Sequence, residues 1–330
     1  MEDFIQYVRR RIPSNWKSNS GGWVSGNCPM CVKNGQPRPD TRGRGGFRFS
    51  VNEFGYNCFN CGYTIRWSPG SRISHKLKSL LYEFGAEKSE IQRFVLRNLQ
   101  SEEYAQRELA EKIRYEINWP TSQLPEESVH ITECDPDSRY VSRALRLIHD
   151  RQLEFHSDWY YSNNWKWKRR LILPLRYESN IVGYAARDLT PNPKQFKYLI
   201  ETPKNFVYGL DKQTENKKIT IVTEGYIDAI VTDGVAIGSN QLNDDQADII
   251  EDLHKDIILL PDRNAAGAIL AERAIEYGWK ISFPPWDRDV IDANDAMIKY
   301  GRYFTVHSII KFAEANSTKQ KVLTKQYCKD

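Results

Sequence analysis

The chain has 330 residues, of which 40% are hydrophobic and 27% charged, with a formal net charge of +4. These proportions are typical of globular proteins and exclude a chain that is disordered throughout. Because a single hydrophobic core stops growing near ~250 residues, we expect two or three domains. No uncharged apolar run approaches the ~20 residues that cross a bilayer, so we expect a cytoplasmic protein with no membrane partner.

Charge is segregated along the chain. Residues 1–72 carry 11 Lys and Arg against 4 Asp and Glu, and residues 157–212 carry 10 against 5. Residues 215–300 reverse the balance, with 8 basic against 17 acidic residues. Basic segments attract polyanions, and carboxylates collect the divalent cations that act on phosphates. Solvated surfaces of mixed sign would give the same counts.

The first half of the chain changes from a loop-rich to a helical pattern. Residues 1–72 are rich in Gly, Arg and aromatic residues, which indicates a small β module. Apolar residues then recur at spacings of three and four from Ile73 to Leu99, and a second helical stretch lies near residues 138–150. We therefore expect a helical linker over residues 73–150.

The second half changes from strands to alternating strands and helices. Residues 151–215 alternate aromatic, β-branched and turn-forming residues, which predicts a basic β-rich subdomain with a hairpin turn at residues 178–180. Residues 216–310 alternate short apolar runs with helical segments, which predicts a β-α-β-α-β-α-β series and a parallel sheet. Residues 311–330 are polar and are expected to form a C-terminal tail. The predicted class is an α+β multidomain protein.

Four of the six cysteines form two Cys-x-x-Cys pairs separated by 26 residues, namely Cys28, Cys31, Cys58 and Cys61. Four thiolates on two tight turns suit a tetrahedral Zn²⁺. One such pair could be a redox pair, but two pairs at this spacing favour a zinc ribbon, with a hairpin in the intervening segment. Because four thiolates leave no open coordination position, we expect one structural zinc. Cys134 and Cys328 are expected to be small apolar or surface residues.

Cations and aromatic rings alternate around these cysteines. This mixture suits single-stranded nucleic acid, because bases stack on rings at about 1–3 kcal/mol each while Arg contacts phosphate. So small a module must also use part of its rings as a core, Phe47 or Phe49 among them. We expect Arg48, Tyr56 and Arg66 to be exposed contacts.

Acidic residues follow three of the apolar runs between residues 216 and 310. Glu224 and Asp228 follow ITIVT, Asp262 follows IILLP, and a longer group follows ISFPPW: Asp287, Asp289, Asp292, Asn294 and Asp295. Because the carboxyl ends of parallel strands meet at one edge, we expect these side chains to converge. Oxygen ligands without His or Cys favour Mg²⁺ or Mn²⁺. Any one of them alone is more commonly a helix N-cap or a solvated loop residue, since Asp is frequent at helix starts.

The acidic segments EGYIDAI, PDRNAAGAILAERA and DANDAMIKYG resemble the motifs of the Toprim domain, which are a Glu-Gly pair, an Asp-x-Asp with a nearby Gly, and a later acidic cluster. Toprim proteins with an N-terminal zinc ribbon and a basic β domain are DnaG-type DNA primases. Upstream, RLILPL, IVGYAAR, KY and YGL look like the basic motif of the primase polymerase core. Without a helicase-binding domain or a phosphate-binding loop, the chain is most similar to the stand-alone primases of T-even-type bacteriophages.

The resemblance implies a nucleotidyltransferase, a DNA-directed RNA polymerase that makes short RNA primers for lagging-strand DNA replication. It implies Glu224 as the catalytic glutamate and Asp262 as the principal metal ligand. The chain departs from the family at Asn264 and Asn294, where amides replace carboxylates, and Asp295, Asp287 or Asp289 could compensate. The expected catalytic set is Glu224, Asp262, Asn264, Asp228 and Asp292. The expected Mg²⁺ or Mn²⁺ ligands are Glu224, Asp262, Asn264, Asp292, Asn294 and Asp295.

The implied partners are single-stranded DNA, ribonucleoside triphosphates and a hexameric replicative helicase on a separate chain, in the host cytoplasm if the protein is of phage origin. Arg170, Arg187 and Lys197 are expected to bind the triphosphate or the template–primer backbone, since guanidinium groups match phosphate oxygens. Arg187 could instead form a surface ion pair with its neighbour Asp188.

Two other functions are compatible with the acidic edge. A Toprim nuclease or topoisomerase-like enzyme would cut DNA there, although the basic primase motif speaks against it and no room remains for a further domain carrying a nucleophilic Tyr. A recombination-mediator-like clamp would bind DNA without catalysis, although Glu224 together with Asp262 speaks against that. The product distinguishes the three: new oligoribonucleotides, cut DNA or neither.

Overall fold

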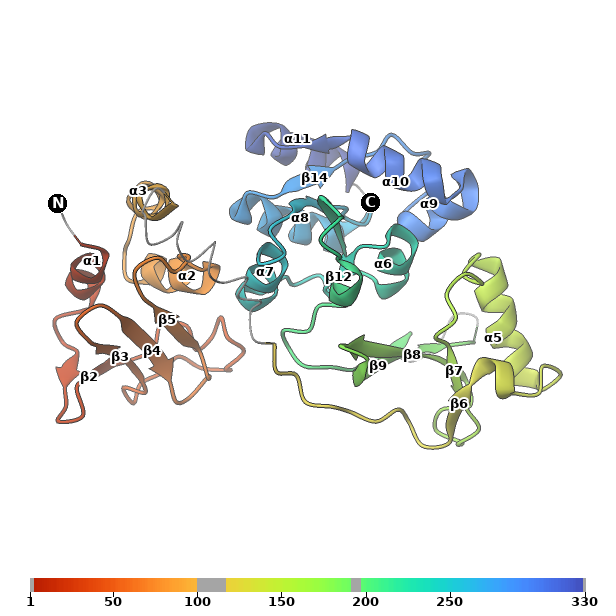
Figure 1. The fold of residues 1–330 in the computed structure, drawn as a ribbon, viewed down its shortest axis with the longest axis horizontal. Coiled ribbons are helices and arrows are strands. Elements are labelled where there is room, and N and C mark those ends of the chain that lie inside the picture. Colours follow the sequence, from red (N-terminus) through yellow and green to blue (C-terminus); the bar gives the residue numbers. More distant parts are fainter. Residues whose placement is uncertain (1–2, 100–116, 191–196, 329–330) are drawn as a thin grey trace. The chain divides into compact units, whose positions relative to one another are not determined.

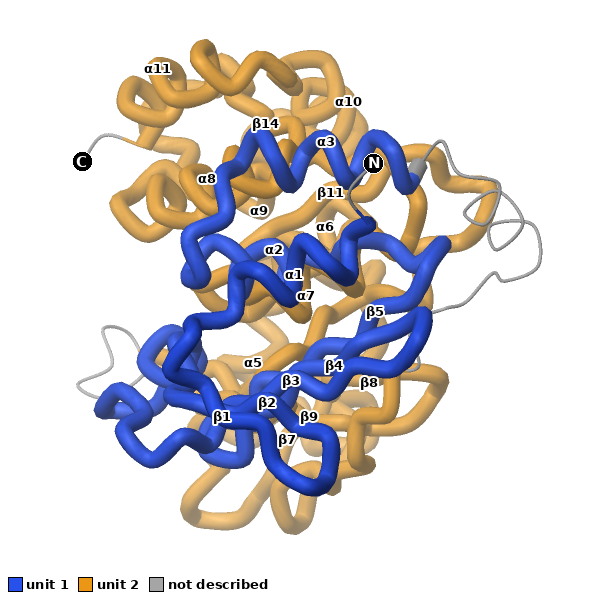
Figure 2. The backbone as a smooth tube through the Cα atoms, turned by 90° about the vertical axis from the view of Figure 1, so that its left-hand side faces the viewer, with its two compact units in different colours: residues 1–114 blue, residues 115–330 orange. Residues whose placement is uncertain are grey.

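The computed structural model describes residues 3–99, 117–190 and 197–328. The chain forms two compact units, Met1–Arg114 and Tyr115–Asp330 (Figure 2). The part of the predicted helical linker between residues 100 and 116 lies outside the described residues. No helix in the described part of the chain is long and apolar enough to cross a membrane.

The first unit is an antiparallel sheet with its helices on one side (Figure 1). Its strands follow the chain order β1-β2-β3-β4-β5, so each pairs with its neighbour in sequence. Apolar residues of the helices pack on the rings of Phe47 and Phe54 to form one core. The elements are α1 (Phe4–Arg11), β1 (Lys17–Ser18), β2 (Trp23–Gly26), β3 (Gly45–Phe49), β4 (Phe54–Cys58), β5 (Thr64–Trp67), α2 (His75–Glu83) and α3 (Lys88–Leu99).

The second unit begins with a second antiparallel sheet, in the order β10-β9-β8-β7-β6. The predicted hairpin turn joins β8 to β9. Glu178 and Ser179 both have positive φ, 47° and 68°, the backbone of a two-residue turn that matches strand twist. The elements are β6 (Ser128–His130), η1 (Ile131–Glu133), α5 (Arg139–Asp150), β7 (Tyr160–Ser162), β8 (Arg170–Tyr177), β9 (Asn180–Asp188), β10 (Tyr198–Glu201) and η2 (Leu210–Lys212).

The same unit continues with the predicted alternating series. Its sheet has the order β12-β11-β13-β14-β15, in which only β15 is antiparallel. The predicted mixed α and β class is therefore confirmed. The elements are β11 (Ile219–Thr223), α6 (Tyr226–Thr232), β12 (Val235–Ala236), α7 (Asp244–Glu251), β13 (Asp256–Leu259), α8 (Ala265–Tyr277), β14 (Lys280–Ser282), α9 (Ala293–Tyr300), α10 (Arg302–Lys311), β15 (Ala313–Glu314) and α11 (Ser317–Tyr327).

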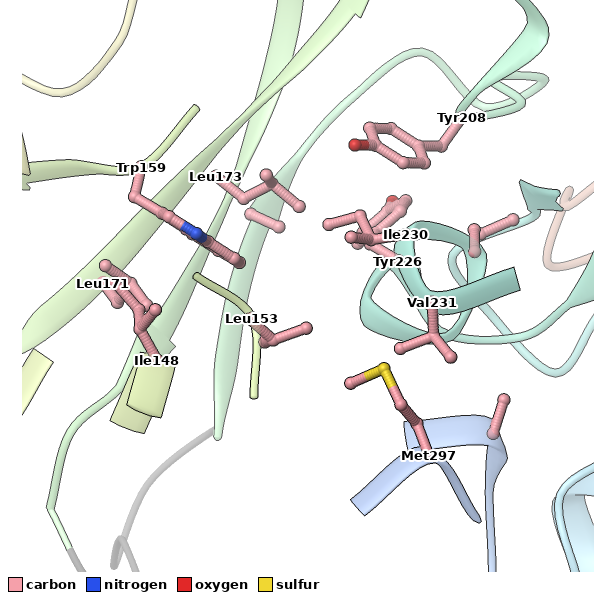
Figure 3. Close-up of a cluster of buried hydrophobic side chains, with 14 of the residues drawn as sticks. Ile148, Leu153, Trp159, Leu171, Leu173, Tyr208, Tyr226, Ile230, Val231 and Met297 are labelled. Atoms are coloured by element: carbon pink, nitrogen blue, oxygen red, sulfur yellow. The ribbon is translucent and has the colours of Figure 1, made fainter. Parts of the chain in front are cut away.

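The core between the two sheets of this unit positions the candidate site. Leu171 and Leu173 of β8, together with Trp159, face Tyr226 of α6 and Met297 of α9 (Figure 3). Helices α7 and α8 cover the opposite face of the parallel sheet with a separate apolar cluster. The acidic loops at the ends of β11 and β13 are thus held against the antiparallel sheet by buried apolar contacts.

The C-terminal residues correct one prediction. Residues 311–330 were expected to be a polar tail, but they contribute β15 and helix α11, which packs on α8. The buried residues of α11 are polar: Gln320 is 1% exposed, and its Nε2 donates to the carbonyl of Trp279 at 2.8 Å. The buried face of α11 consists of polar residues whose hydrogen bonds are satisfied inside the protein. The sequence of this helix therefore has no apolar pattern that would predict its packing.

Candidate functional site

The four cysteines of the two pairs meet in the first unit. Their Sγ atoms all lie within 4.8 Å of one another, with 3.8 Å between Cys31 and Cys58 and 4.0 Å between Cys28 and Cys61. Burial raises the pKa of the Cys28 and Cys31 thiols, so a bound divalent cation is needed to keep both ionised. The cluster could therefore hold one tetrahedral Zn²⁺.

Asp40 supports this cluster, although it was not among the predicted site residues. Its carboxylate accepts the backbone N–H groups of Cys28 at 3.0 Å and Arg44 at 2.8 Å, and the Arg44 Nε at 2.9 Å. Although burial opposes ionisation, these hydrogen bonds lower the pKa of Asp40 to about 2. The ionised Asp40 thus fixes the first cysteine turn. A single acid 12 residues after a cysteine carries no recognisable signal.

Of the three predicted nucleic-acid contacts in this unit, Arg48 and Arg66 are exposed and Tyr56 is not. Tyr56 is 1% exposed and packs edge-on against Phe47 at 4.9 Å. The reason is strand alternation: in β4 Tyr56 shares the inward face with Phe54 and Cys58. The Arg66 side chain pairs with Glu53 at 3.0 Å.

Phe59 is the most exposed aromatic ring among the described residues of this unit, and it was not among the predicted contacts. Phe59 lies between Cys58 and Cys61, is 78% exposed, and has its ring 6.3 Å from that of Trp23. Its place directly after Cys58 is a signal that sequence reasoning could have used, because Cys58 faces inward at the end of β4 and strand alternation turns the next side chain outward.

In the second unit, four of the predicted acidic residues line one cavity of about 270 Å³. Glu224 follows β11, Asp228 lies in the first turn of α6, Asp262 follows β13, and Asp292 caps α9. The cavity is also lined by cations and by apolar residues of the antiparallel sheet, including Arg151, Arg187, Lys197, Trp159, Leu171 and Leu173. The convergence expected for the ends of parallel strands is present.

These carboxylates are crowded and desolvated. Burial raises the pKa of Glu224 and Asp228, and nearby Asp292 and Asp262 raise that of Asp228 further. Burial and the neighbouring Glu224 and Asp292 raise the pKa of Asp262 to about 7. Moreover, Oε2 of Glu224 is buried without a hydrogen-bond partner within the described residues. An unpartnered oxygen among several carboxylates fits Mg²⁺ or Mn²⁺, which would hold all of them ionised.

The two amides expected to be metal ligands have other partners. Asn264 Oδ1 caps α8 by accepting the backbone N–H of Gly267 at 2.9 Å. Asn294 is fully buried; its Oδ1 accepts Nη1 of Arg151 at 2.8 Å and its Nδ2 donates to the Arg151 carbonyl at 2.9 Å. Neither residue is among those that line the cavity. The structure thus gives Asn264 a capping role and makes Asn294 the residue that positions Arg151.

The acids expected to compensate for these amides are not at the cavity. Asp287 and Asp289 are exposed and pair with Lys299, at 2.9 and 2.8 Å. Asp295 lies nearer, with Oδ1 3.9 Å from Nη1 of Arg151. Its Oδ2 accepts the backbone N–H of Ile291 at 3.4 Å.

The basic residues also separate into two groups. Arg187 and Lys197 line the cavity, and Nη1 of Arg187 donates to the Tyr198 hydroxyl at 2.7 Å. Burial and the neighbouring Arg187 lower the pKa of Lys197. Arg170 does not line the cavity: its guanidinium is buried, donates to the Ala186 carbonyl at 2.9 Å and lies 3.5 Å from Asp188. Arg170 and Asp188 are register partners in β8 and β9, so Arg170 rather than Arg187 pairs with that acid.

Two further features were missed. Arg151, which lines the cavity directly after α5, is the first residue of the predicted β-rich subdomain, where a single cation after a helix is not a specific signal. Trp165 is 81% exposed on a turn that also carries exposed Lys166 and Arg169. The run NNWKWKRR could have indicated this turn, since it interleaves rings and cations as the cysteine module does.

Comparison with known proteins gives likenesses of structure alone. No family model matches the chain, and no curated protein matches it. It is similar to a DnaG primase catalytic domain bound to ssDNA, with 17% identity, 58% of this chain and 78% of that chain covered, and a TM-score of 0.45. It is also similar to the zinc-binding and RNA polymerase domains of the Aquifex aeolicus primase, with 16% identity, coverages of 99% and 90%, and a TM-score of 0.39. A third likeness is to the RNA polymerase domain of the Mycobacterium tuberculosis primase DnaG, with 18% identity, coverages of 68% and 81%, and a TM-score of 0.41.

Proposed function

We propose that this chain is a DNA primase of the DnaG type, which joins ribonucleotides on a single-stranded DNA template. The observation that carries the proposal is the cavity of the second unit, where Glu224, Asp262 and Asp292 share one space with Arg187 and Lys197. Carboxylates that collect divalent cations, facing cations that bind phosphate, are what nucleotidyl transfer to a triphosphate requires.

In this reaction a 3′-hydroxyl attacks an α-phosphate and pyrophosphate leaves. Bound Mg²⁺ or Mn²⁺ supplies positive charge to the attacking and leaving oxygens, and Glu224, Asp262 and Asp292 would hold it. As an alternative to holding the cation, Glu224 is suited to accept the proton of the hydroxyl, because desolvation raises its pKa and one oxygen has no hydrogen-bond partner within the described residues. Arg187 and Lys197, which line the same cavity, bind the triphosphate oxygens.

Exposed rings and cations in both units support binding of a single strand. Phe59 and Trp165 each present a free face to solvent, and Arg48, Lys166 and Arg169 lie exposed in the same segments. A duplex hides its base faces, whereas a single strand can stack bases on such rings. We therefore propose that the cysteine module over residues 1–72 is a zinc ribbon that selects a template site, and that residues 216–310 are the Toprim catalytic domain.

Partners and cellular context follow from this assignment. We propose that residues 151–215 are the basic subdomain of the polymerase core, linked to the ribbon by residues 73–150. A hexameric replicative helicase on a separate chain would supply the exposed template, and the T-even-type phage primases would be the nearest subfamily, acting in the host cytoplasm.

The test is a primer-synthesis assay on single-stranded DNA with labelled ribonucleoside triphosphates and Mg²⁺ or Mn²⁺, resolved on a denaturing gel. Glu224→Gln should remove the RNA products while single-stranded DNA binding persists. Glu272→Gln is the matched control, because Glu272 is exposed on α8, away from the cavity. Shortened DNA in place of RNA would establish the nuclease alternative, and binding without any product would establish the clamp.

A further inference from the structure

Arg263 joins the two loops that carry Asp262 and Asp292. Its backbone N–H donates to the carbonyl of Ile291 at 3.0 Å. Its guanidinium donates to three more carbonyls of that second loop, those of Asp287 at 2.6 Å, Pro284 at 3.0 Å and Val290 at 3.4 Å. One residue adjacent to Asp262 therefore fixes most of the segment between β14 and the helix that Asp292 caps.

These bonds are made to carbonyl oxygens and not to a carboxylate. No ion pair of Arg263 occurs within the described residues, so the guanidinium does not neutralise the acidic edge by direct pairing. The planar fork of Arg can hold several carbonyls in fixed directions at once, which the single ammonium of Lys cannot. Loop geometry therefore depends on the shape of this side chain as much as on its charge.

Helix α11 completes the arrangement. The guanidinium carbon of Arg263 lies 4.4 Å from the centre of the Tyr327 ring, the last residue of α11. The Tyr327 ring also packs edge-on against Phe283, which follows β14, at 5.6 Å. Next to it, Sγ of Cys328 donates to the carbonyl of Asp262 at 3.5 Å. The C-terminal helix thus contacts both loops, and a cation–π contact holds the guanidinium in place.

The first turn of α8 packs against the backbone of the Asp262 loop. A Cβ at Gly267 would lie 2.0 Å from the carbonyl oxygen of Asp262, so the helix backbone is packed directly on that peptide. The Asp262 loop consequently has α8 on one side and Arg263 with α11 on the other. Little freedom is left for Asp262 to adjust to a bound cation by itself.

We propose that Arg263, held by Tyr327, is a positioning residue for the divalent cation, setting the separation of Asp262 and Asp292. The inference rests on the proposed function only in taking the acidic edge to bind Mg²⁺ or Mn²⁺. Residues that orient metal ligands from behind typically change metal affinity by ~10–100-fold when replaced. The C-terminal helix is therefore part of the metal site although it contributes no ligand.

The test measures Mn²⁺ binding to the whole 330-residue chain, loaded with Zn²⁺, by electron paramagnetic resonance of the free Mn²⁺ ion, so no catalysis is needed. Arg263→Lys keeps the charge and loses the fork, and should weaken Mn²⁺ binding by about 10-fold or more. Arg288→Lys makes the same change on an exposed side chain of the same loop and should leave binding unchanged. Asp262→Asn removes a proposed ligand, so the Mn²⁺ binding that this variant loses is the binding at the carboxylates of the cavity.

The second contact is tested at Tyr327. Tyr327→Phe keeps the ring and should bind Mn²⁺ as the parent does, whereas Tyr327→Leu should weaken binding by a smaller factor than Arg263→Lys. If the primase activity exists, Arg263→Lys should regain most of its kcat at saturating Mn²⁺, with the KM for template unchanged, which a general loss of structure would not allow.

Circular dichroism shows which variants are folded. A folded Arg263→Lys protein that binds Mn²⁺ with the parental affinity would overturn the inference. An equal loss of Mn²⁺ affinity in Arg288→Lys would overturn it as well. Mn²⁺ bound at the edge without any RNA product would overturn the proposed function while leaving the role of Arg263 intact.

Discussion

The cysteine cluster and the acidic edge both bring together groups that repel one another when ionised, but they are assembled differently. The four thiols come from two turns of one small sheet, within residues 28–61. The carboxylates come from four separate positions between Glu224 and Asp292 and face an open cavity of about 270 Å³. A closed set of four ligands serves structure, whereas an open set leaves room for a reacting molecule.

The largest expected effect tests whether the closed cluster is structural. Removing zinc by chelation, or replacing Cys58 with Ser, should unfold the first unit, because structural zinc contributes about 10–16 kcal/mol in zinc-finger peptides. The second unit should stay folded and keep its Mn²⁺ binding, which calorimetry would show as two separate unfolding transitions.

The same change should abolish template-dependent initiation, while extension of a supplied primer survives. Assays of primer initiation and of primer extension measure these two activities. Cys134→Ser, in the second unit, is the control, and equal loss of initiation and extension would contradict delivery by the ribbon.

The next effect tests whether the open cluster needs a cation. Since the pKa of Asp262 rises from 3.8 to about 7 on folding, the folded state binds this proton more tightly than the unfolded state does. The resulting stabilisation is complete below the unfolded pKa and is lost as pH rises through about 7. Urea unfolding of the second unit without Mg²⁺ should therefore give stability that falls between about pH 4 and about pH 7.

Two comparisons check the origin of that pH dependence. Asp262→Asn should reduce it, because the variant carries no titrating group at this position. Mg²⁺ should restore stability on the alkaline side, where the carboxylates are ionised and able to bind it. A pH dependence that is the same in the variant would place its cause elsewhere.

A smaller effect separates the two amides that replace expected acids. Asn294→Asp should destabilise the second unit by about 1–3 kcal/mol, because the Arg151 carbonyl loses its buried donor and a carboxylate is placed beside Asp228. Asn264→Asp should change stability by less than about 0.5 kcal/mol, since Asp caps helices as well as Asn does. Equal effects in urea unfolding would contradict the different roles assigned to Asn264 and Asn294.

The smallest effect concerns the exposed ring of the cysteine module. Phe59→Ala should weaken single-stranded DNA binding by about 1 kcal/mol, the lower end of the range for one stacked base. Tyr56→Phe should leave DNA binding unchanged, because the Tyr56 ring lies in the core. Fluorescence anisotropy with a labelled oligonucleotide measures both, and a loss of affinity only in Tyr56→Phe would reverse the assignment.

Local and periodic features were predictable from sequence, whereas those set by distant contacts were not. The cysteine spacing, the hairpin at residues 178–180 and the alternating series after residue 216 each depend on neighbours in the chain, and all are present. Topology then predicted that Glu224, Asp262 and Asp292 converge. The contacts of individual side chains were harder to predict. Arg170 and Asn294 are of residue types that could bind phosphate or a metal, yet Arg170 pairs with Asp188 and Asn294 hydrogen-bonds to Arg151.

Helix α11 and Arg151 are features of the structure that the sequence did not predict. Gln320 and Thr324 are buried and form hydrogen bonds to backbone carbonyls, so the hydrophobicity of the sequence does not indicate that this helix face is buried. Arg151 reaches the cavity because α5 packs on the antiparallel sheet, a contact between elements that are not adjacent in the chain. By contrast, strand alternation in β4 could have placed Tyr56 inside from sequence alone.

The order of strands in the two units also bears on when each of the two proposed metal sites forms during synthesis. In the first unit every strand pairs with its neighbour in sequence, so its sheet can form as soon as residues up to Trp67 have left the ribosome. At roughly 5–20 residues per second, Asp292 follows at least about ten seconds later. If the cysteine cluster holds Zn²⁺ and the acidic residues hold Mg²⁺ or Mn²⁺, as proposed, we expect the nascent chain to bind Zn²⁺ before the carboxylates converge, so that they do not compete with the thiols for zinc.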